Sequence, residues 1–276
     1  MQEWDTEFAS RLPLYEPLRA HAAMLSGVDW PDLPQLQRMI DKQGIVTGGG
    51  KPLRVVEQVP KSGSFEERYE ARIYLRGELQ VRRRDWHDLF NLLAWAAFPR
   101  AKTALNARHY RALLDQHARG APNRGPAQDA LTLFDEGGIV VASSDSELLE
   151  DLRGFEWERL FRGRRERVTQ HMRWFLFGHA IYEKALAPFE GITACGVLLA
   201  VDDAWLALPQ AAQMAVLDER LAASIADAAC FTRPRGLQPV PILGIPGWWP
   251  PNEGEHYYAN TDYFRPGRRG GRTQAG

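Results

Sequence analysis

The feature that most constrains the fold is a stretch at residues 82–109, RRRDWHDLFNLLAWAAFPRAKTALNARH, in which polar and strongly apolar residues are closely mixed. Phe98 and Pro99 divide it, because proline interrupts a helix but is favoured in the first turn of the next one. The spacing predicts one helix at about 85–98 and a second at about 99–118. The apolar stripe of such a joint must be buried, which brings polar side chains close to a core.

The remaining patterns alternate between helix and strand. YEARIYLRGELQVRR at 69–83 predicts a hairpin that turns at Gly77 and Glu78, and LTLFDEGGIVVASSD at 131–145 predicts a second hairpin. A long helix is expected at about 166–187. Because hairpins rather than single strands separate the helices, we expect a predominantly helical α+β fold and not a doubly wound parallel sheet.

The C-terminal part differs from the rest. Residues 242–264 contain too many prolines for regular structure but are rich in aromatic side chains, so we expect an extended arm that wraps over the body. The last ten residues, GRRGGRTQAG at 267–276, have a composition typical of disorder. No repeat or domain boundary stands out, and residues 1–266 are predicted to form a single domain.

Composition and charge exclude several classes of protein. The formal net charge is −1 over 276 residues, so the chain has no overall attraction to nucleic acid or to membranes. Cys195 and Cys230 do not form a CxxC pair, which argues against a thiolate zinc site and favours reduced thiols, with a disulfide between them as the alternative. The start, MQEWDTEF, lacks signal-peptide form, and no run approaches the ~18–20 apolar residues that span a bilayer. We therefore expect a soluble, cytoplasmic protein without membrane association.

Candidate chemistry is concentrated on the first two predicted helices. Four-residue spacing places His87 above Asn91, at the edge of an apolar face and near a helix start. The helix dipole disfavours an imidazolium there, so a neutral ring could accept a proton or bind a metal. In the second helix Lys102, Asn106 and His109 share a face and could grip an anionic substrate, or act as donor, orienter and base.

A third group lies in the predicted helix at 166–187, where four side chains would share one face: His171, Phe175, His179 and Glu183. His179 and Glu183 form an HxxxE pair, a spacing at which both side chains can bind one metal ion. The acidic pairs at 135–136 and 202–203 offer further oxygen donors, although turn and helix-cap chemistry explains them more simply. Imidazoles with carboxylates would suit zinc, manganese or iron(II).

Arginines gather near the opening stretch and again at 162–168. Arg84 and Arg108 could hold phosphate groups, or a nucleic-acid backbone, if they share a face with Lys102. The simpler interpretation is a solvated surface balanced by nearby acids. An alternative function is therefore a non-catalytic binding or scaffold protein that uses the arginine clusters and the aromatic arm.

Four segments together resemble domain-of-unknown-function family 3025, a family of bacterial proteins of about this length. They are YEARIYLRGELQVRRRDWHDLFNLLAWAAFPRAKTALNARH, DALTLFDEGGIVVASSD, RWFLFGHAIYEKALAPF and ILGIPGWWPPNEGEHYYANTDYFRPGRR. The resemblance covers most of residues 5–269 and implies a bacterial protein, but no activity and no site residue. The order of His87, Asn106 and His109 also resembles HNH-type nucleases, whose sites require a ββα finger with the first histidine on a strand.

These observations lead to the hypothesis of a bacterial hydrolase, with or without a divalent metal, that acts on a phosphate-bearing or other anionic substrate. The predicted roles are catalysis by His87, Asn106 and His109, substrate binding by Asn91, Lys102, Arg84 and Arg108, and metal binding by His179 and Glu183. The hypothesis requires the three histidines at 87, 109 and 179 to surround one concave pocket, within on the order of 10 Å.

Overall fold

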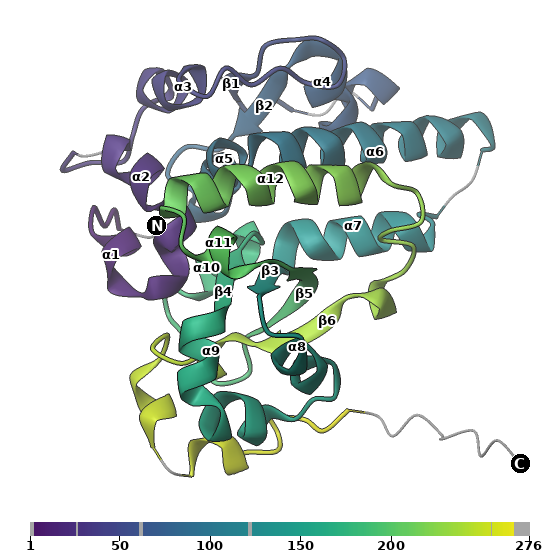
Figure 1. Ribbon diagram of the computed structural model, residues 1–276. Helices are drawn as coiled ribbons and strands as arrows, with labels where there is room; N and C mark the ends of the chain where they lie inside the picture. The colour runs from purple at the N-terminus through teal and green to yellow at the C-terminus, as the bar shows by residue number, and fades with distance from the viewer. Residues whose placement is uncertain (1–2, 26, 61–62, 121–122, 255, 268–276) are drawn as a thin grey trace, which may run out of the picture.

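The structure, a computed structural model, describes residues 3–25, 27–60, 63–120, 123–254 and 256–267. It is 55% helical and 13% strand in two small sheets, which confirms the α+β class. Figure 1 shows a layered arrangement, with the small sheet and helices α3 and α4 at one end, long helices in the middle, and the larger sheet beyond them. The C-terminal segment lies at the opposite end from the small sheet.

The helices are α1 (Phe8–Arg11), α2 (Arg19–Ala22), α3 (Leu33–Asp41), α4 (Tyr69–Arg76), α5 (Trp86–Ala97), α6 (Pro99–Ala118), α7 (Pro126–Gly137), α8 (Ser146–Arg153), α9 (Arg165–His171), α10 (His179–Lys184), α11 (Asp203–Leu206) and α12 (Gln210–Ala226). The strands are β1 (Arg54–Glu57), β2 (Glu78–Val81), β3 (Gly138–Ser143), β4 (Met172–Leu176), β5 (Thr193–Ala200) and β6 (Gln238–Pro241).

The larger sheet has the order β4-β3-β5-β6. Strand β3 pairs antiparallel with β4 and parallel with β5, and β5 pairs antiparallel with β6. All of β3 is buried, as expected for a continuous apolar strand in the middle of a sheet. The end of α7, which runs directly into β3, is thereby fixed against the core.

The helical joint at Phe98 and Pro99 is confirmed. Helix α5 begins after Asp85, whose carboxylate accepts a hydrogen bond from the backbone N–H of Asp88, and Phe98 is fully buried between α5 and α6. Helix α12 lies along α6 (Figure 1), and Asp218 of α12 accepts hydrogen bonds from the first free N–H groups of α6. The joint is therefore held from outside as well as by its own core.

The first predicted hairpin is wrong. Tyr69–Arg76 forms helix α4, and the following strand β2 pairs parallel with β1. Gly77 has φ of 70° and ends the helix as a left-handed C-terminal residue instead of turning a hairpin. A Cβ at Gly77 would lie 2.2 Å from the carbonyl oxygen of Pro52, so no larger residue fits.

The second predicted hairpin and the long helix at 166–187 are also wrong. Helix α7 runs as far as Gly137, so the acidic pair at 135–136 lies in a last helical turn and not in a hairpin turn. Of the two leucines that suggested a strand, Leu131 is buried with Ala130 and Phe134 at helical spacing, whereas Leu133 is 39% exposed. The region at 166–187 divides into α9, β4 and α10, which separates His171 from His179.

The C-terminal segment, for which an extended arm was predicted, contains 3₁₀ turns at Ile242–Gly244, Pro250–Glu253 and Tyr257–Ala259. Its aromatic side chains include the buried Trp248 and Tyr258, which join one apolar cluster that reaches from Phe8 to Phe264. The predicted disordered tail lies outside the described residues except for Gly267. In the described ranges, no helix has both the length and the apolarity needed to cross a bilayer.

Candidate metal centre

Three side chains from three different helices meet at one point. His87 is the second residue of α5, Glu136 the second-last residue of α7, and His179 the first residue of α10. Their nearest ligand atoms all lie within 4.8 Å of one another. The Nε2 atoms of the two imidazoles are 3.2 Å apart, and His179 Nε2 is 3.6 Å from Glu136 Oε2. Two imidazole nitrogens bound tetrahedrally at about 2.0–2.1 Å from zinc would be roughly 3.3 Å apart, so the spacing fits a metal.

A close backbone contact brings two of these helices together. Gly178, the residue before α10, donates its N–H to the carbonyl oxygen of Gly138, just beyond α7, over 2.9 Å. A Cβ at Gly178 would lie 2.4 Å from the Gly138 nitrogen and 2.6 Å from the Glu136 carbonyl oxygen. Only glycine therefore allows α10 to begin against the end of α7, which places His179 beside Glu136.

The Nδ1 nitrogen of each imidazole lies within hydrogen-bonding distance of an acceptor. His179 Nδ1 lies 2.8 Å from the backbone oxygen of Asp135, and His87 Nδ1 lies 3.0 Å from Glu183 Oε2. A carbonyl oxygen only accepts hydrogen bonds, as does an ionised carboxylate, so each Nδ1 carries the proton and each Nε2 presents a lone pair. Two facing lone pairs repel unless a proton or a cation lies between them. Acceptors behind both imidazoles are typical of metal-binding histidines.

Burial tunes the ionisation of the centre. It lowers the pKa of His179 to about 4, which keeps the ring in the neutral form that binds metals. It also raises the pKa of the Glu136 carboxyl. For Asp135, burial acts to raise the pKa, but the neighbouring Lys102 and His179 outweigh burial and the pKa is lowered. The centre thus combines a neutral imidazole with an ionised carboxylate close behind it.

The three side chains lie on the wall of a polar cavity of about 340 Å³. Helices α4, α5, α6 and α7 supply the rest of the lining: Tyr69, Glu70, Asp88, Asn91, His109, Leu113, Gln116, Gln128, Thr132 and Asp135, together with Arg82 and Arg124. The three histidines at 87, 109 and 179 therefore face one cavity, as the hydrolase hypothesis requires.

Lys102 and Asn91, which were predicted to bind substrate, belong to one buried network, in which Asn91 lines the cavity and Lys102 lies behind its wall. Lys102 is 2% exposed, and its Nζ donates to Asn91 Oδ1 over 2.8 Å and to Asp135 Oδ1 over 2.5 Å. Asn91 Nδ2 in turn lies 2.7 Å from the hydroxyl of Tyr69. The ammonium of Lys102 is thus engaged within the protein. Through Asp135 the network fixes the last turn of α7, which carries Glu136.

His109 lines the α6 side of the same cavity, whereas Asn106, which was predicted to be catalytic, is 1% exposed and is not among the lining residues. Asn106 Nδ2 donates to Glu70 Oε2 over 2.6 Å, and its buried Oδ1 has no hydrogen-bond partner among the described residues. Burial raises the pKa of Glu70 to about 7 and lowers that of His109 to about 4. This wall therefore presents a neutral imidazole and a carboxyl that titrates near neutral pH.

Three other predicted residues have different surroundings. Arg108 donates to the backbone oxygens of Ile225, Asp227 and Cys230, so it holds the end of α12. Arg84 lines a different pocket. Glu183 lies behind His87 and is not among the three clustered ligands, whereas Glu136 is.

Sequence reasoning named the acidic pair at 135–136 but favoured a turn for it. The available signal was helical: Gln128, Thr132 and Glu136 are four residues apart and all line the cavity. The arginine clusters form many ion pairs within the chain, for example Arg82 with Asp88 and Arg167 with Asp145.

Residues 53–268 match the model of a protein family described as "Protein of unknown function (DUF3025)". The chain belongs to this family. All three clustered ligands and all cavity-lining residues of this DUF3025 protein fall within the matched region. No curated protein and no solved structure matches the chain. The HNH likeness lacks its structural basis in the described residues, because His87 lies on a helix and the preceding strand pairs in parallel.

Proposed function

We propose that this DUF3025 protein is a metal-dependent hydrolase whose centre is formed by His87, Glu136 and His179. The observation that carries the proposal is the pair of Nε2 atoms 3.2 Å apart, each on an imidazole whose Nδ1 faces an acceptor. A zinc, manganese or iron(II) ion bound there would lower the pKa of a water molecule and supply a nucleophile at neutral pH.

The charge around the centre supports a cation. Five described carboxylates lie on the cavity wall or directly behind it: Glu70, Asp88, Asp135, Glu136 and Glu183. Three described cationic side chains accompany them: Arg82, Lys102 and Arg124. With all of these side chains ionised, one divalent ion would balance the excess of negative charge. An anionic substrate alone would increase that excess.

The expected substrate is an ester with an anionic group, such as a phosphate ester. Arg124 lines the cavity, and its Nη1 lies 3.4 Å from Thr132 Oγ1, one helical turn before Glu136 on α7. We infer that this guanidinium would bind the anionic group of the substrate, while His87, Glu136 and His179 would hold the metal that activates water. His109, which is buried and neutral on the α6 side of the cavity, would accept the proton of the attacking water.

Steady-state kinetics test this function. Metal-loaded protein is assayed with bis(p-nitrophenyl) phosphate and with the neutral ester p-nitrophenyl acetate. We expect E136Q to abolish turnover of both, and R124Q to raise the KM for the phosphate diester about tenfold while leaving the neutral ester unchanged. R119Q, which changes an exposed arginine at the end of α6, is the matched control. Absence of metal-dependent turnover, or equal activity of wild type and E136Q, would contradict the proposal.

A further inference from the structure

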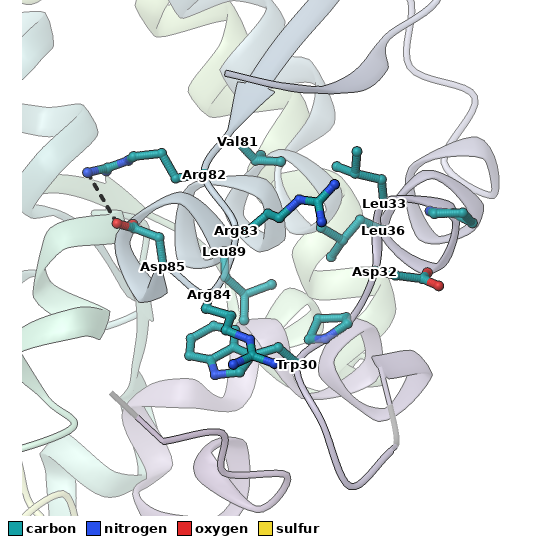
Figure 2. A pocket seen from close by; sticks show the side chains of 12 residues that line it. Trp30, Asp32, Leu33, Leu36, Val81, Arg82, Arg83, Arg84, Asp85 and Leu89 are labelled. Carbon is teal, nitrogen blue, oxygen red and sulfur yellow. Dashed lines mark ion pairs between the residues drawn. The ribbon is translucent and has the colours of Figure 1, made fainter. Parts of the chain in front are cut away.

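A second pocket, of about 300 Å³, lies between the start of α3 and the segment that joins β2 to α5 (Figure 2). It is separate from the candidate metal centre, although Arg82 lines both cavities. Its volume is at the lower end of the range for small-molecule sites, which is about 300–1,000 Å³. The metal-dependent chemistry proposed above makes no use of it.

The body of this pocket is apolar and well supported. Leu36, Val81 and Leu89 contribute buried side chains, and Trp30 and Leu33 are half-buried beside them. The Trp30 indole is held by the ring of Trp86 at 4.9 Å and by that of Trp4 at 5.3 Å. The walls are therefore fixed by packing, as in a preformed site.

All but one of the charges at the opening are already satisfied. Arg82 pairs with Asp85 (Figure 2) and Asp88, and Arg83 pairs with Glu57. Asp32 accepts the N–H of Gln35 in a capping box, and Asp85 caps α5. Arg84 is different, because it makes no hydrogen bond and no ion pair with any residue in the described part of the chain.

The backbone of Arg84 is also unusual. Its φ is 56°, a left-handed conformation that is unfavourable for a residue with a side chain and favours glycine. Position 84 is an arginine, although a glycine there would relieve the strain of the left-handed backbone conformation. Figure 2 shows its side chain at the same end of the pocket as Trp30, next to the apolar walls. The pocket thus combines an apolar body with one uncompensated guanidinium.

We propose that this pocket binds a small amphipathic carboxylate, with its apolar body against Trp30 and the leucines and its carboxylate on Arg84. A guanidinium forms a two-pronged, charge-assisted hydrogen bond with a carboxylate. One unpaired positive charge matches a monoanion, and the neighbouring carboxylates of Asp32 and Asp85 disfavour a dianion such as a phosphate monoester.

Calorimetric titration with octanoate, and with octan-1-ol as the neutral match, tests the proposal. We expect octanoate to bind wild type at least tenfold more tightly than octan-1-ol does, and R84Q to lose that preference. R119Q, another exposed arginine, should bind octanoate as wild type does. Equal affinity of the two ligands for wild type, or an octanoate affinity that R84Q leaves unchanged, would overturn the proposal.

A second variant separates binding from folding. R84G removes the guanidinium and relieves the left-handed strain, so we expect its Tm to be equal to that of wild type or about 2 °C higher. We also expect it to lose octanoate binding to the same extent as R84Q. Undiminished octanoate binding by a stable R84G would show that the guanidinium is not the recognition element and would overturn the proposal.

Discussion

At the scale of single residues, the candidate metal centre depends on the groups behind its ligands. Glu183, which was predicted to bind the metal itself, accepts the hydrogen bond from His87 Nδ1 over 3.0 Å. An acceptor in this place fixes the ring orientation and makes the opposite nitrogen a stronger ligand. Glu183 is therefore expected to act on the metal through His87.

The E183A variant tests that indirect role. We expect its zinc affinity to fall about 10- to 100-fold, because outer partners of ligating histidines typically contribute that much. The measurement is competition with a fluorescent zinc chelator, and E166A, which removes an exposed glutamate of α9, is the control. A loss of binding as complete as that of a ligand variant would show that Glu183 binds the metal directly.

His109 should make the stability of the protein dependent on pH. Burial lowers its pKa to about 4, whereas an unfolded histidine has a pKa of about 6.5. The unfolded state therefore takes up the proton first, so the contribution of His109 to stability is present above pH 6.5 and is lost as the pH falls towards 4.

Urea unfolding of wild type and H109Q at several pH values measures this contribution. Between pH 7.5 and pH 5, wild type should lose about 2 kcal/mol more stability than H109Q does. Parallel pH profiles for the two proteins would mean that the imidazole is not held neutral by the fold.

At the scale of elements, the sequence predicted the helices that have strong periodicity and a clear boundary, such as α5 and α6 around Pro99. It failed where a glycine has two interpretations. Gly77 and Gly138 follow segments short enough to fit both the strand and the helix period, and each was taken for a hairpin turn. In the structure both glycines follow the last residue of a helix. Only tertiary contacts decide between a helix and a strand for the segments before them.

The candidate site was predictable to a similar extent. His87, His109 and His179 could be named because imidazoles are rare and chemically distinctive. The sequence could not decide whether Glu183 or Glu136 joins the histidines as a metal ligand, because this depends on how α10 begins against the end of α7. That arrangement is set by the contact between Gly178 and Gly138, and a local sequence pattern carries no information about it.

The G178A variant tests this contact. Its methyl group would lie 2.4 Å from the Gly138 nitrogen, so α7 and α10 must separate. We expect a loss of roughly 1–3 kcal/mol in unfolding free energy, together with weaker metal binding. G236A is the control, because a Cβ there meets no atom within 4 Å. Normal metal affinity in a G178A protein of reduced stability would show that the contact supports the fold but not the site.

At the scale of the whole molecule, five of the described helices (α4, α5, α6, α7 and α10) line the cavity, and the long helices lie between the two sheets (Figure 1). Lys102, Asn91 and Asp135 link α5, α6 and α7 behind the metal ligands. Arg82 lies between that cavity and the pocket beside Trp30. These links support a rigid frame in which ligands from three helices converge before any ion binds.

The most direct test of the central claim is the metal content after equilibrium dialysis against zinc, measured by elemental analysis. We predict close to one tightly bound ion per chain in wild type and in H171N, whose imidazole lies at the end of α9 away from the cavity. The H87N/H179N double variant should retain no tightly bound zinc. A wild type without bound metal, or a double variant that retains as much as wild type, would contradict the account.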